Sequence, residues 1–253
     1  MKKITYDMLP ADFIELYTKA LDSSLGLASL QVEGYTLNGD AKTVSNMMRQ
    51  DSALQYAKSV IDPSRNNEYT YKFDLLYGTL EIAKRISDYE IQDFRKRPIE
   101  VIGSNVPRTD AYLIKSELLA AYDNYLYFLN SLNERKDTIS DEIYEREFFE
   151  NEARLHIRLL HIHPFEDYNG RTMRTILTTN LLKTNHAPAI ITSDTKKEYN
   201  NYIENSDAAG LGHFLRICSL KEYTNMVLLY HDYSKNKKME SGKKLGQKKQ
   251  HNN

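Results

Sequence analysis

Apolar residues recur every three to four positions along most of this chain, which is the spacing of an α-helix that buries one face. Such segments cover residues 12–21, 40–60, 71–87, 112–131, 140–161, 170–183, 194–205 and 208–231. A further short segment runs from Ala28 to Glu33 and ends at Gly34, and glycine is common just past a helix C-terminus. The pattern predicts a mainly α-helical protein.

One segment, residues 97–108, departs from the helical spacing. Ile99 and Val101 alternate with other residues, a turn-forming Gly-Ser-Asn follows, and Val106 comes after the turn. We expect a small β-hairpin that rests on the helices, because an isolated hairpin is only marginally stable. Exposed hairpins of this kind bind extended segments of other proteins.

Composition is that of a globular protein, with 41% hydrophobic and 27% charged residues. The single cysteine, Cys218, excludes an internal disulfide and fits a reducing compartment, so we expect a cytoplasmic protein. The N-terminal residues lack the apolar core of a signal peptide. No stretch has the apolar length of a membrane span, so no membrane partner is expected.

The C-terminal residues carry a strong positive charge. Residues 235–253 contain seven lysines and one glutamate and have very few apolar side chains. A segment that can bury so little does not offset the entropy of ordering, so we predict a disordered basic tail over residues 232–253. Its lysine runs lack aromatic residues and a helical stripe, which favours a solvated tail over a nucleic-acid or membrane patch.

The most informative segment joins two predicted helices. An apolar helix ends at His163, because Pro164 disfavours helical geometry in the residue before it. After a short loop, Asn169 is a favoured N-cap, so a new helix is expected to begin at Gly170 or Arg171. The free N–H groups and positive dipole at a helix N-terminus bind phosphate, and a glycine there lets the backbone approach an anion closely.

Charged side chains surround this expected anion site. Arg171 and Arg174 are three positions apart, so they share a face of the first helical turn and present forked donors to a polyphosphate. Asp167 is a carboxylate suited to Mg²⁺ that bridges phosphate oxygens. His163 is a neutral base that can take a proton from an attacking hydroxyl. Together these groups predict phosphoryl or nucleotidyl transfer.

Each residue also has a plainer interpretation. Asp167 alone can cap a loop, and the two arginines can belong to a solvated helix face. Phe165 is expected to be a core residue that anchors the loop. His156 and His161 are expected to pack or to form hydrogen bonds rather than to bind metal, because His161 and His163 have no third ligand at a convincing spacing.

The segment from His163 to Arg174 resembles the signature of the Fic family, His-Pro-Phe-x-(Asp/Glu)-Gly-Asn-Gly-Arg-x-x-Arg. One position departs from it, because Tyr168 stands where the family has its first glycine, and a bulky side chain there narrows the loop and imposes unfavourable backbone geometry. The matching positions are His163, Pro164, Phe165, Asp167, Asn169, Gly170, Arg171 and Arg174.

The resemblance implies a Fic-type helical bundle with a small β-hairpin flap, and three regions. These are N-terminal helices over residues 1–69, a catalytic core over residues 70–231 and the basic tail. The implied activity is that of a protein adenylyltransferase, a nucleotidyltransferase that moves AMP from ATP, with Mg²⁺, to a Ser, Thr or Tyr hydroxyl of a target protein. The resemblance leaves open whether the chain forms a homo-oligomer.

The same resemblance assigns roles to residues. His163 is the catalytic base and Asp167 the metal ligand. The segment at 97–108 corresponds to the flap that holds the target by strand addition. Tyr199 and Tyr202 lie in the region that frames adenine, although core packing is the default for both. The nucleotide-binding residues are Asn169, Gly170, Arg171 and Arg174, and the flap residues are Ile99, Val101 and Ile102.

A second motif lies near the N-terminus. The residues from Ser29 to Gly34 resemble the Ser/Thr-x-x-x-Glu-(Gly/Asn) pattern of self-inhibited Fic proteins. The resemblance implies that Glu33 pairs with Arg174 and occupies the guanidinium that would hold the γ-phosphate of ATP. Two alternatives remain: a hydrolase that removes AMP, with Glu33 positioning water, and a binding or toxin–antitoxin protein whose donor site is blocked by Tyr168.

Overall fold

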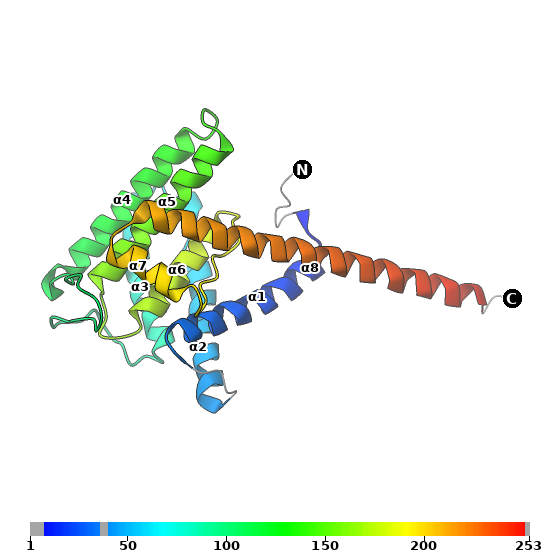
Figure 1. Ribbon diagram of the computed structural model, residues 1–253, viewed down its shortest axis with the longest axis horizontal. Helices are drawn as coiled ribbons and strands as arrows, with labels where there is room; N and C mark the ends of the chain where they lie inside the picture. Colours follow the sequence, from blue (N-terminus) through cyan, green and yellow to red (C-terminus); the bar gives the residue numbers. More distant parts are fainter. Residues whose placement is uncertain (1–7, 36–39, 251–253) are drawn as a thin grey trace.

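The computed structural model describes residues 8–35 and 40–250, with side chains described through residue 237. The α-helices within these residues are α1 (Ala11–Val32), α2 (Ala41–Val60), α3 (Tyr71–Ile86), α4 (Ile114–Glu134), α5 (Asp141–Ile162), α6 (Asn169–Lys183), α7 (Lys196–Glu204) and α8 (Ala208–Gln250). Two short 3₁₀ turns, η2 (Pro63–Arg65) and η3 (Ala111–Leu113), lie between them. The prediction of a mainly helical protein is confirmed (Figure 1).

Helix α6 lies at the centre of the bundle, where it contacts α1, α2, α3 and α5. All of its residues from Arg171 to Leu181 are buried, although many of them are polar. Thr175 and Thr179 donate their hydroxyls to the carbonyls four residues earlier, at 2.9 and 2.8 Å, which lets a threonine-rich helix sit in a core. The central position of α6 therefore buries both motif arginines.

The main core forms where α5 packs against α4, α6 and α8, and where α3 packs against α2, α4 and α6. Its largest fully buried side chains include Tyr122, Phe148, Phe149 and Phe165. A second, separate apolar cluster joins α1 to α8. It consists of Leu9, Phe13, Tyr17, Leu21 and Met226. This second cluster holds the N-terminal helix against the outer part of the bundle.

Helix α1 is continuous from Ala11 to Val32, although the sequence pattern indicated two shorter helical segments. Serines in its middle do not interrupt it, because Ser23 and Ser24 donate their hydroxyls to the carbonyls of Lys19 and Ala20, each four residues earlier. Near its start, the Tyr17 hydroxyl donates to Glu222 of α8 at 2.7 Å. The helix thus reaches from α8 to the N-terminal end of α6.

The β-hairpin expected over residues 97–108 is not present, because none of the described residues lies in a strand. The segment instead bends through a turn in which Ser104 N–H donates to the Val101 carbonyl, with Gly103 at a φ of +82°. The Ser104 hydroxyl then donates to Glu204 of α7 at 2.8 Å. This contact with a helix replaces the strand pairing that the alternating pattern indicated.

The C-terminal region also differs from expectation. Helix α8 continues to Gln250 and extends well past the body of the bundle (Figure 1), so residues 232–250 of the expected disordered tail are helical; residues 251–253 lie outside the described residues. Lysine, glutamine, methionine and leucine are good helix formers, and no proline interrupts them. In the part of the chain that the structure describes, no helix combines the length and apolar character needed to cross a membrane.

Candidate active site

His163 forms the C-terminal end of α5 in a left-handed conformation, with φ 51° and ψ 61°. Its ring Nδ1 lies 3.3 Å from the Leu160 carbonyl. Because a carbonyl only accepts, this contact assigns the proton to Nδ1 and leaves Nε2 with a lone pair. Burial, together with the charge of Arg108, lowers the pKa of His163 to about 4. The imidazole is therefore neutral near pH 7 and able to accept a proton.

The loop after His163 is held closed by Asn169. Its side-chain oxygen accepts from Phe165 N–H at 3.0 Å, and its amide donates to the Phe165 carbonyl at 2.9 Å. The expected N-cap role of Asn169 is therefore wrong, since α6 begins at Asn169 and Tyr168 occupies the cap position without a side-chain cap bond. Phe165 is fully buried and stacks on Phe94 with ring centroids 5.6 Å apart, in agreement with its expected role as an anchor.

Tyr168 adopts the left-handed conformation that favours glycine, with φ 65° and ψ 8°. Its ring lies over the guanidinium of Arg171, 4.4 Å from Cζ, and its hydroxyl is 3.3 Å from a Glu90 carboxylate oxygen. Burial and the charge of Glu90 raise the pKa of this tyrosine. The loop thus keeps the backbone shape of a glycine-containing loop, while the side chain covers Arg171.

Arg171 is 2% exposed, and its guanidinium lies over the rings of Tyr168 and Tyr35, with Cζ 4.4 and 5.6 Å from their centroids. Its Nε is buried and has no hydrogen-bond partner among the described residues. A buried guanidinium stacked on aromatic rings is not part of a solvated helix face. The plainer interpretation of this arginine is therefore excluded.

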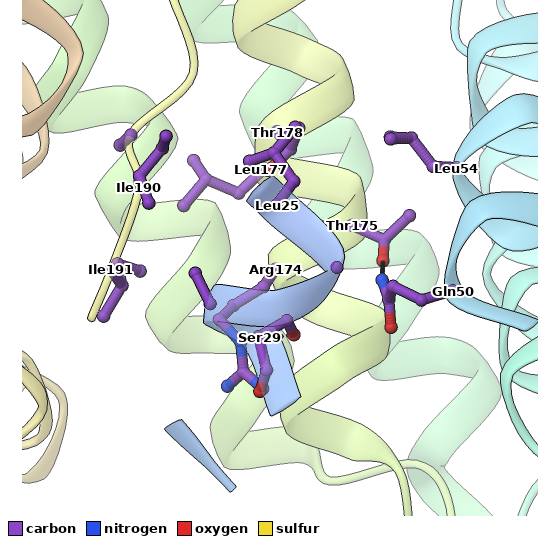
Figure 2. Close-up of a pocket in the computed structure, with 13 residues that line it drawn as sticks. Leu25, Ser29, Gln50, Leu54, Arg174, Thr175, Leu177, Thr178, Ile190 and Ile191 are labelled. Atoms are coloured by element: carbon purple, nitrogen blue, oxygen red, sulfur yellow. Dashed lines mark hydrogen bonds between the residues drawn. The ribbon is translucent and has the colours of Figure 1, made fainter. Parts of the chain in front are cut away.

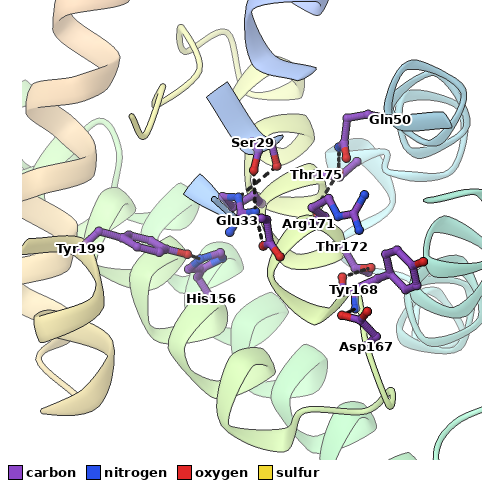
Figure 3. A network of polar contacts seen from close by, with 11 residues as sticks. Ser29, Glu33, Gln50, His156, Asp167, Tyr168, Arg171, Thr172, Thr175 and Tyr199 are labelled. Atoms are coloured by element: carbon purple, nitrogen blue, oxygen red, sulfur yellow. Dashed lines mark hydrogen bonds and ion pairs between the residues drawn. The ribbon is translucent and has the colours of Figure 1, made fainter. Parts of the chain in front are cut away.

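Arg174 and Glu33, 141 positions apart in the sequence, form an ion pair with Nη2 and Oε1 2.6 Å apart. Arg174 also donates from Nε to the Ser29 hydroxyl at 3.1 Å and from Nη2 to the Ser29 carbonyl at 3.2 Å. Figure 3 shows Ser29 and Glu33 projecting from α1 onto the first turn of α6. The acceptors of these three bonds belong to the N-terminal motif.

The carboxylate of Glu33 also lies close to the backbone of Gly170. A Cβ atom added at Gly170 would be 2.6 Å from Glu33 Oε1 and 3.0 Å from Arg174 Nη1. A helix N-terminus with a glycine and an arginine is suited to a phosphate, and a carboxylate is a smaller anion of the same sign. Glu33 therefore occupies the space that an anionic ligand at this helix end would need.

Gly34 fixes where Glu33 sits. Glu33 is the last residue with helical geometry, and Gly34 follows with a φ of +88°. Tyr35 N–H donates to the Leu30 carbonyl at 3.1 Å and Gly34 N–H to the Gln31 carbonyl at 3.0 Å, which is a Schellman motif. This cap ends α1 directly above α6 and points Glu33 at Arg174.

A small cleft of about 30 Å³, open to solvent, adjoins Ser29 and Arg174. Figure 2 shows that the cleft is bordered by α1, α2, α6 and the irregular segment at residues 189–191. Its walls are mostly apolar, and the polar residues in its lining are Ser29, Gln50, Arg174, Thr175 and Thr178. Its mostly apolar walls distinguish the cleft from the polar groups around Gly170 at the start of α6.

Asp167 is exposed in the loop, and its Oδ1 accepts from Tyr168 N–H at 2.6 Å. Across the described residues, no group of three or more His, Cys, Asp or Glu side chains could hold a metal ion. A single carboxylate is sufficient for Mg²⁺ when substrate phosphates and water complete its six ligands. Asp167 thus fits a magnesium ion that arrives with a nucleotide.

The other candidate residues are placed as packing groups. His156 is 2% exposed, and its Nε2 is 2.5 Å from the Tyr199 hydroxyl. Tyr199 is equally buried, and burial raises its pKa to about 12. Tyr202 packs on Phe214, and its hydroxyl donates to Glu198 at 3.0 Å. His161 Nε2 lies 2.9 Å from the Ile203 carbonyl. These contacts show His156 and His161 in hydrogen bonds, as expected.

Of the expected flap residues, Ile99 and Val101 are half-buried and Ile102 is fully exposed. Sequence reasoning missed Arg95, which is 4% exposed and donates to the His163 carbonyl from Nε at 2.7 Å. No signal in the sequence distinguishes it, because Arg95-Lys96-Arg97 reads as a solvated basic run.

Comparison with known proteins gives a consistent picture. The Fic/DOC family model matches residues 77–181. Curated proteins named protein adenylyltransferase Fic, from Culex quinquefasciatus and Aedes aegypti, are each 25% identical over 180 residues, which is 70% of this chain and 33% of theirs. The chain therefore spans about a third of the length of the curated relatives that it matches.

Solved structures agree in fold. A Fic domain containing signaling protein from Bacteroides thetaiotaomicron has a TM-score of 0.67 at 17% identity, covering 88% of this chain and 93% of that one. A fragment of Fic-1 from C. elegans has a TM-score of 0.61 at 16% identity, covering 91% and 69%. The match at residues 77–181 includes the whole loop from His163 to Arg174, and the fold is similar to that of solved Fic proteins, so the chain contains a region that matches the Fic/DOC family model within a Fic-like fold.

Proposed function

We propose that this protein is a protein adenylyltransferase that transfers AMP from ATP to a hydroxyl of a target protein and is inhibited by its own Glu33. The observation that carries the proposal is the 2.6 Å contact between Glu33 and Arg174 above Gly170. It brings an anion, an arginine and a helix N-terminus together in the arrangement that a polyphosphate would need. The curated relatives named protein adenylyltransferase Fic support the same activity.

His163 supplies the base for this reaction. Nε2 of the neutral imidazole accepts the proton of a Ser, Thr or Tyr hydroxyl as its oxygen attacks the α-phosphorus of ATP. The new P–O bond joins AMP to the target, the bond to the β-phosphate oxygen breaks, and pyrophosphate leaves with its electron pair. The imidazolium then releases the proton to solvent, which restores the base.

Arg171, Arg174 and the N–H groups at the start of α6 stabilise the charge on the phosphates. When bound, Mg²⁺ would neutralise phosphate charge next to Asp167. Asp167 is exposed and close to the start of α6, so it can reach a nucleotide there without rearrangement of the core.

Self-inhibition follows from competition for one guanidinium. Arg174 cannot hold the γ-phosphate while Glu33 occupies Nη2, and the carboxylate would also repel a phosphate at Gly170. ATP that binds beside Glu33 is therefore held with its terminal phosphate displaced, and its α-phosphorus is not aligned with the attacking hydroxyl.

The test uses Glu33→Gly protein with α-labelled ATP, Mg²⁺ and a cell lysate. We expect labelled protein bands that the wild type produces only weakly, and loss of all label in the double variant with His163→Ala. Label from γ-labelled ATP in place of α-labelled ATP would instead indicate phosphoryl transfer. Absence of label in every variant, with ATP bound to the protein, would overturn the proposed activity.

The stacking of Tyr168 on Arg171 supports a second candidate, a protein with a Fic fold whose donor site is closed. A ring 4.4 Å from the guanidinium competes with a phosphate for the same face of Arg171. Calorimetric titration with ATP separates the two candidates. Binding by the wild type or by Glu33→Gly supports the transferase, whereas absence of binding by both, with binding gained in Tyr168→Gly, supports the closed site.

A further inference from the structure

The guanidinium of Arg95 binds backbone carbonyls from three separate segments. Nε donates to His163 at 2.7 Å, Nη2 to Ile162 at 3.2 Å, and Nη1 to Arg97 at 2.7 Å. Nη2 also donates to the Thr109 carbonyl. The Arg95 backbone N–H adds a bond to the Pro164 carbonyl at 2.9 Å. One side chain therefore connects the end of α5 with both ends of the segment between Arg97 and Thr109.

These carbonyls need a partner. The last four carbonyls of an α-helix receive no hydrogen bond from an N–H group of the same helix. The carbonyls of Ile162 and His163 lie at this end of α5. Pro164 has no N–H to offer, and the left-handed turn at His163 takes the chain away from the helix axis. A cation at a helix C-terminus is also favoured by the dipole. Arg95 thus supplies hydrogen-bond donors to the Ile162 and His163 carbonyls at this turn.

Arg95 is 4% exposed, and burial lowers its pKa. The five N–H donors of an arginine lie in a rigid plane and can bind carbonyls that point in from different directions. A lysine ammonium has its donors on a single nitrogen and cannot reproduce this arrangement. Nearby, Phe94 stacks on Phe165 with centroids 5.6 Å apart, so the residues on either side of the loop are packed as well. These contacts favour a constant distance between the turn at His163 and the two ends of the segment at residues 97–109.

We propose that Arg95 is a positioning residue that fixes the imidazole of His163 relative to the segment between Arg97 and Thr109, and so sets where an acceptor hydroxyl meets Nε2. The inference rests on the proposed transferase function. It adds that the target segment, held along residues 97–109, is aligned with the base by Arg95 rather than by contacts of its own with the loop. Arg95 touches neither nucleotide nor target in this role.

The experiment compares Arg95→Lys with its parent in the Glu33→Gly background, using self-labelling of the full chain with α-labelled ATP. We expect kcat to fall about 100-fold, because misplacement of a reacting group by about 1 Å costs that much. The KM for ATP is expected to stay within about threefold, since the nucleotide is held by α6 and not by Arg95. The matched control is Arg154→Lys, an exposed arginine of α5, which should leave kcat unchanged.

A spectroscopic arm needs no activity. In protein labelled with ¹⁵N-histidine, the signal of His163 is identified by its loss in His163→Ala, and two-bond ¹H–¹⁵N correlations report which ring nitrogen carries the proton. We expect the Nδ1–H form in the parent and in Arg154→Lys, and a mixture of tautomers in Arg95→Lys. Circular dichroism shows whether Arg95→Lys keeps its helices; if it does not, Arg95→Gln is measured in its place.

The outcomes are distinct. An unchanged His163 tautomer together with unchanged kcat in Arg95→Lys would overturn the positioning role. A loss of kcat accompanied by an equal weakening of ATP affinity would also overturn it, because that pattern indicates a general loss of structure. If the Glu33→Gly parent transfers no label, the proposed transferase function fails, and the spectroscopic arm alone decides whether Arg95 orients His163.

Discussion

Replacement of Glu33 by glycine tests self-inhibition most directly. The side chains of Glu33 and Arg174 are 26% and 10% exposed, so their ion pair is partly shielded from water. Glycine removes the carboxylate and leaves Arg174 bound to the hydroxyl and carbonyl of Ser29. Because Glu33 lies at the capped end of α1, the substitution does not interrupt the helix. The change therefore removes one competitor for Arg174 and little else.

The magnitude follows from this contact. A hydrogen bond between charged groups in a partly buried site is worth roughly 1.5–3 kcal/mol net. Every ~1.4 kcal/mol corresponds to a tenfold change in an equilibrium, so removal of Glu33 should increase the productively bound fraction of ATP by about 10- to 100-fold. The two remaining bonds to Ser29 limit the loss of folding stability to about 1–2 kcal/mol, or a few degrees in Tm.

The assay measures the initial rate of self-labelling by α-labelled ATP, and differential scanning calorimetry measures Tm. Glu15→Gly is the matched control, because Glu15 lies on the same helix in an exposed pair with Lys19. Glycine in a helix interior costs about 1 kcal/mol, so this control should lower Tm by a comparable amount without raising the rate. A faster rate in Glu33→Gly alone would then exclude general loosening of α1.

Two results would contradict the competition between Glu33 and the γ-phosphate for Arg174. Arg174→Ala should be inactive with or without Glu33, because the γ-phosphate has lost its anchor in both cases. A double variant, Glu33→Gly with Arg174→Ala, that is as active as Glu33→Gly alone would falsify the proposed competition. So would a Glu33→Gly rate equal to that of the wild type.

Three further predictions concern other parts of the site and core. His163→Ala in the Glu33→Gly background should reduce the transfer rate by ~10²–10⁴-fold, while calorimetry still detects ATP binding. The transfer rate of the Glu33→Gly parent should stay constant from about pH 8 to about pH 5, because a histidine with a pKa of about 4 remains neutral over that range. Tyr168→Gly should strengthen ATP binding in calorimetric titration, because Arg171 loses the ring that covers it and the left-handed position gains a glycine; unchanged affinity would show that the ring does not obstruct the donor. Burial raises the pKa of Glu152 to about 7, so the folded state binds more protons than the unfolded state between about pH 4.5 and 7, and stability falls as pH rises through that window. Glu152→Gln lacks this titration, so its Tm relative to the wild type should improve from pH 5 to pH 8, and a constant difference in Tm would contradict the raised pKa.

Sequence reasoning located the parts of the site that depend on local order. The stop before Pro164 is a short-range signal, and α5 ends there, with His163 at its C-cap. Helix α6 begins at Asn169, one residue before the expected start. The meeting of Glu33 with Arg174 was expected only from the family resemblance, because no pattern within either segment specifies a partner 141 positions away. Its inhibitory effect stays a prediction.

Two of the remaining features depend on contacts between distant segments. The alternating residues near Val101 indicated a hairpin, whereas Ser104 binds Glu204 of α7 instead. Arg95 carries no distinguishing signal in the sequence, and four carbonyls brought together by the tertiary fold bury it. Asn169 differs, because it was expected to cap a helix but binds the backbone of Phe165, four residues earlier in the same loop.

The position of Glu33 at the last turn of α1 has a consequence for timing. The ends of helices open and close far faster than whole helices detach, because fraying breaks only the few hydrogen bonds of the final turn. Opening of the cap at Gly34 would withdraw Glu33 from Arg174 while the second apolar cluster still holds Phe13 and Tyr17 on α8. We therefore expect a rapid equilibrium between molecules with Glu33 bound to Arg174 and molecules with Glu33 withdrawn. Inhibition then lowers the active fraction throughout the reaction and does not delay the first turnover. Progress curves of the wild type should then be linear from the start, without a lag.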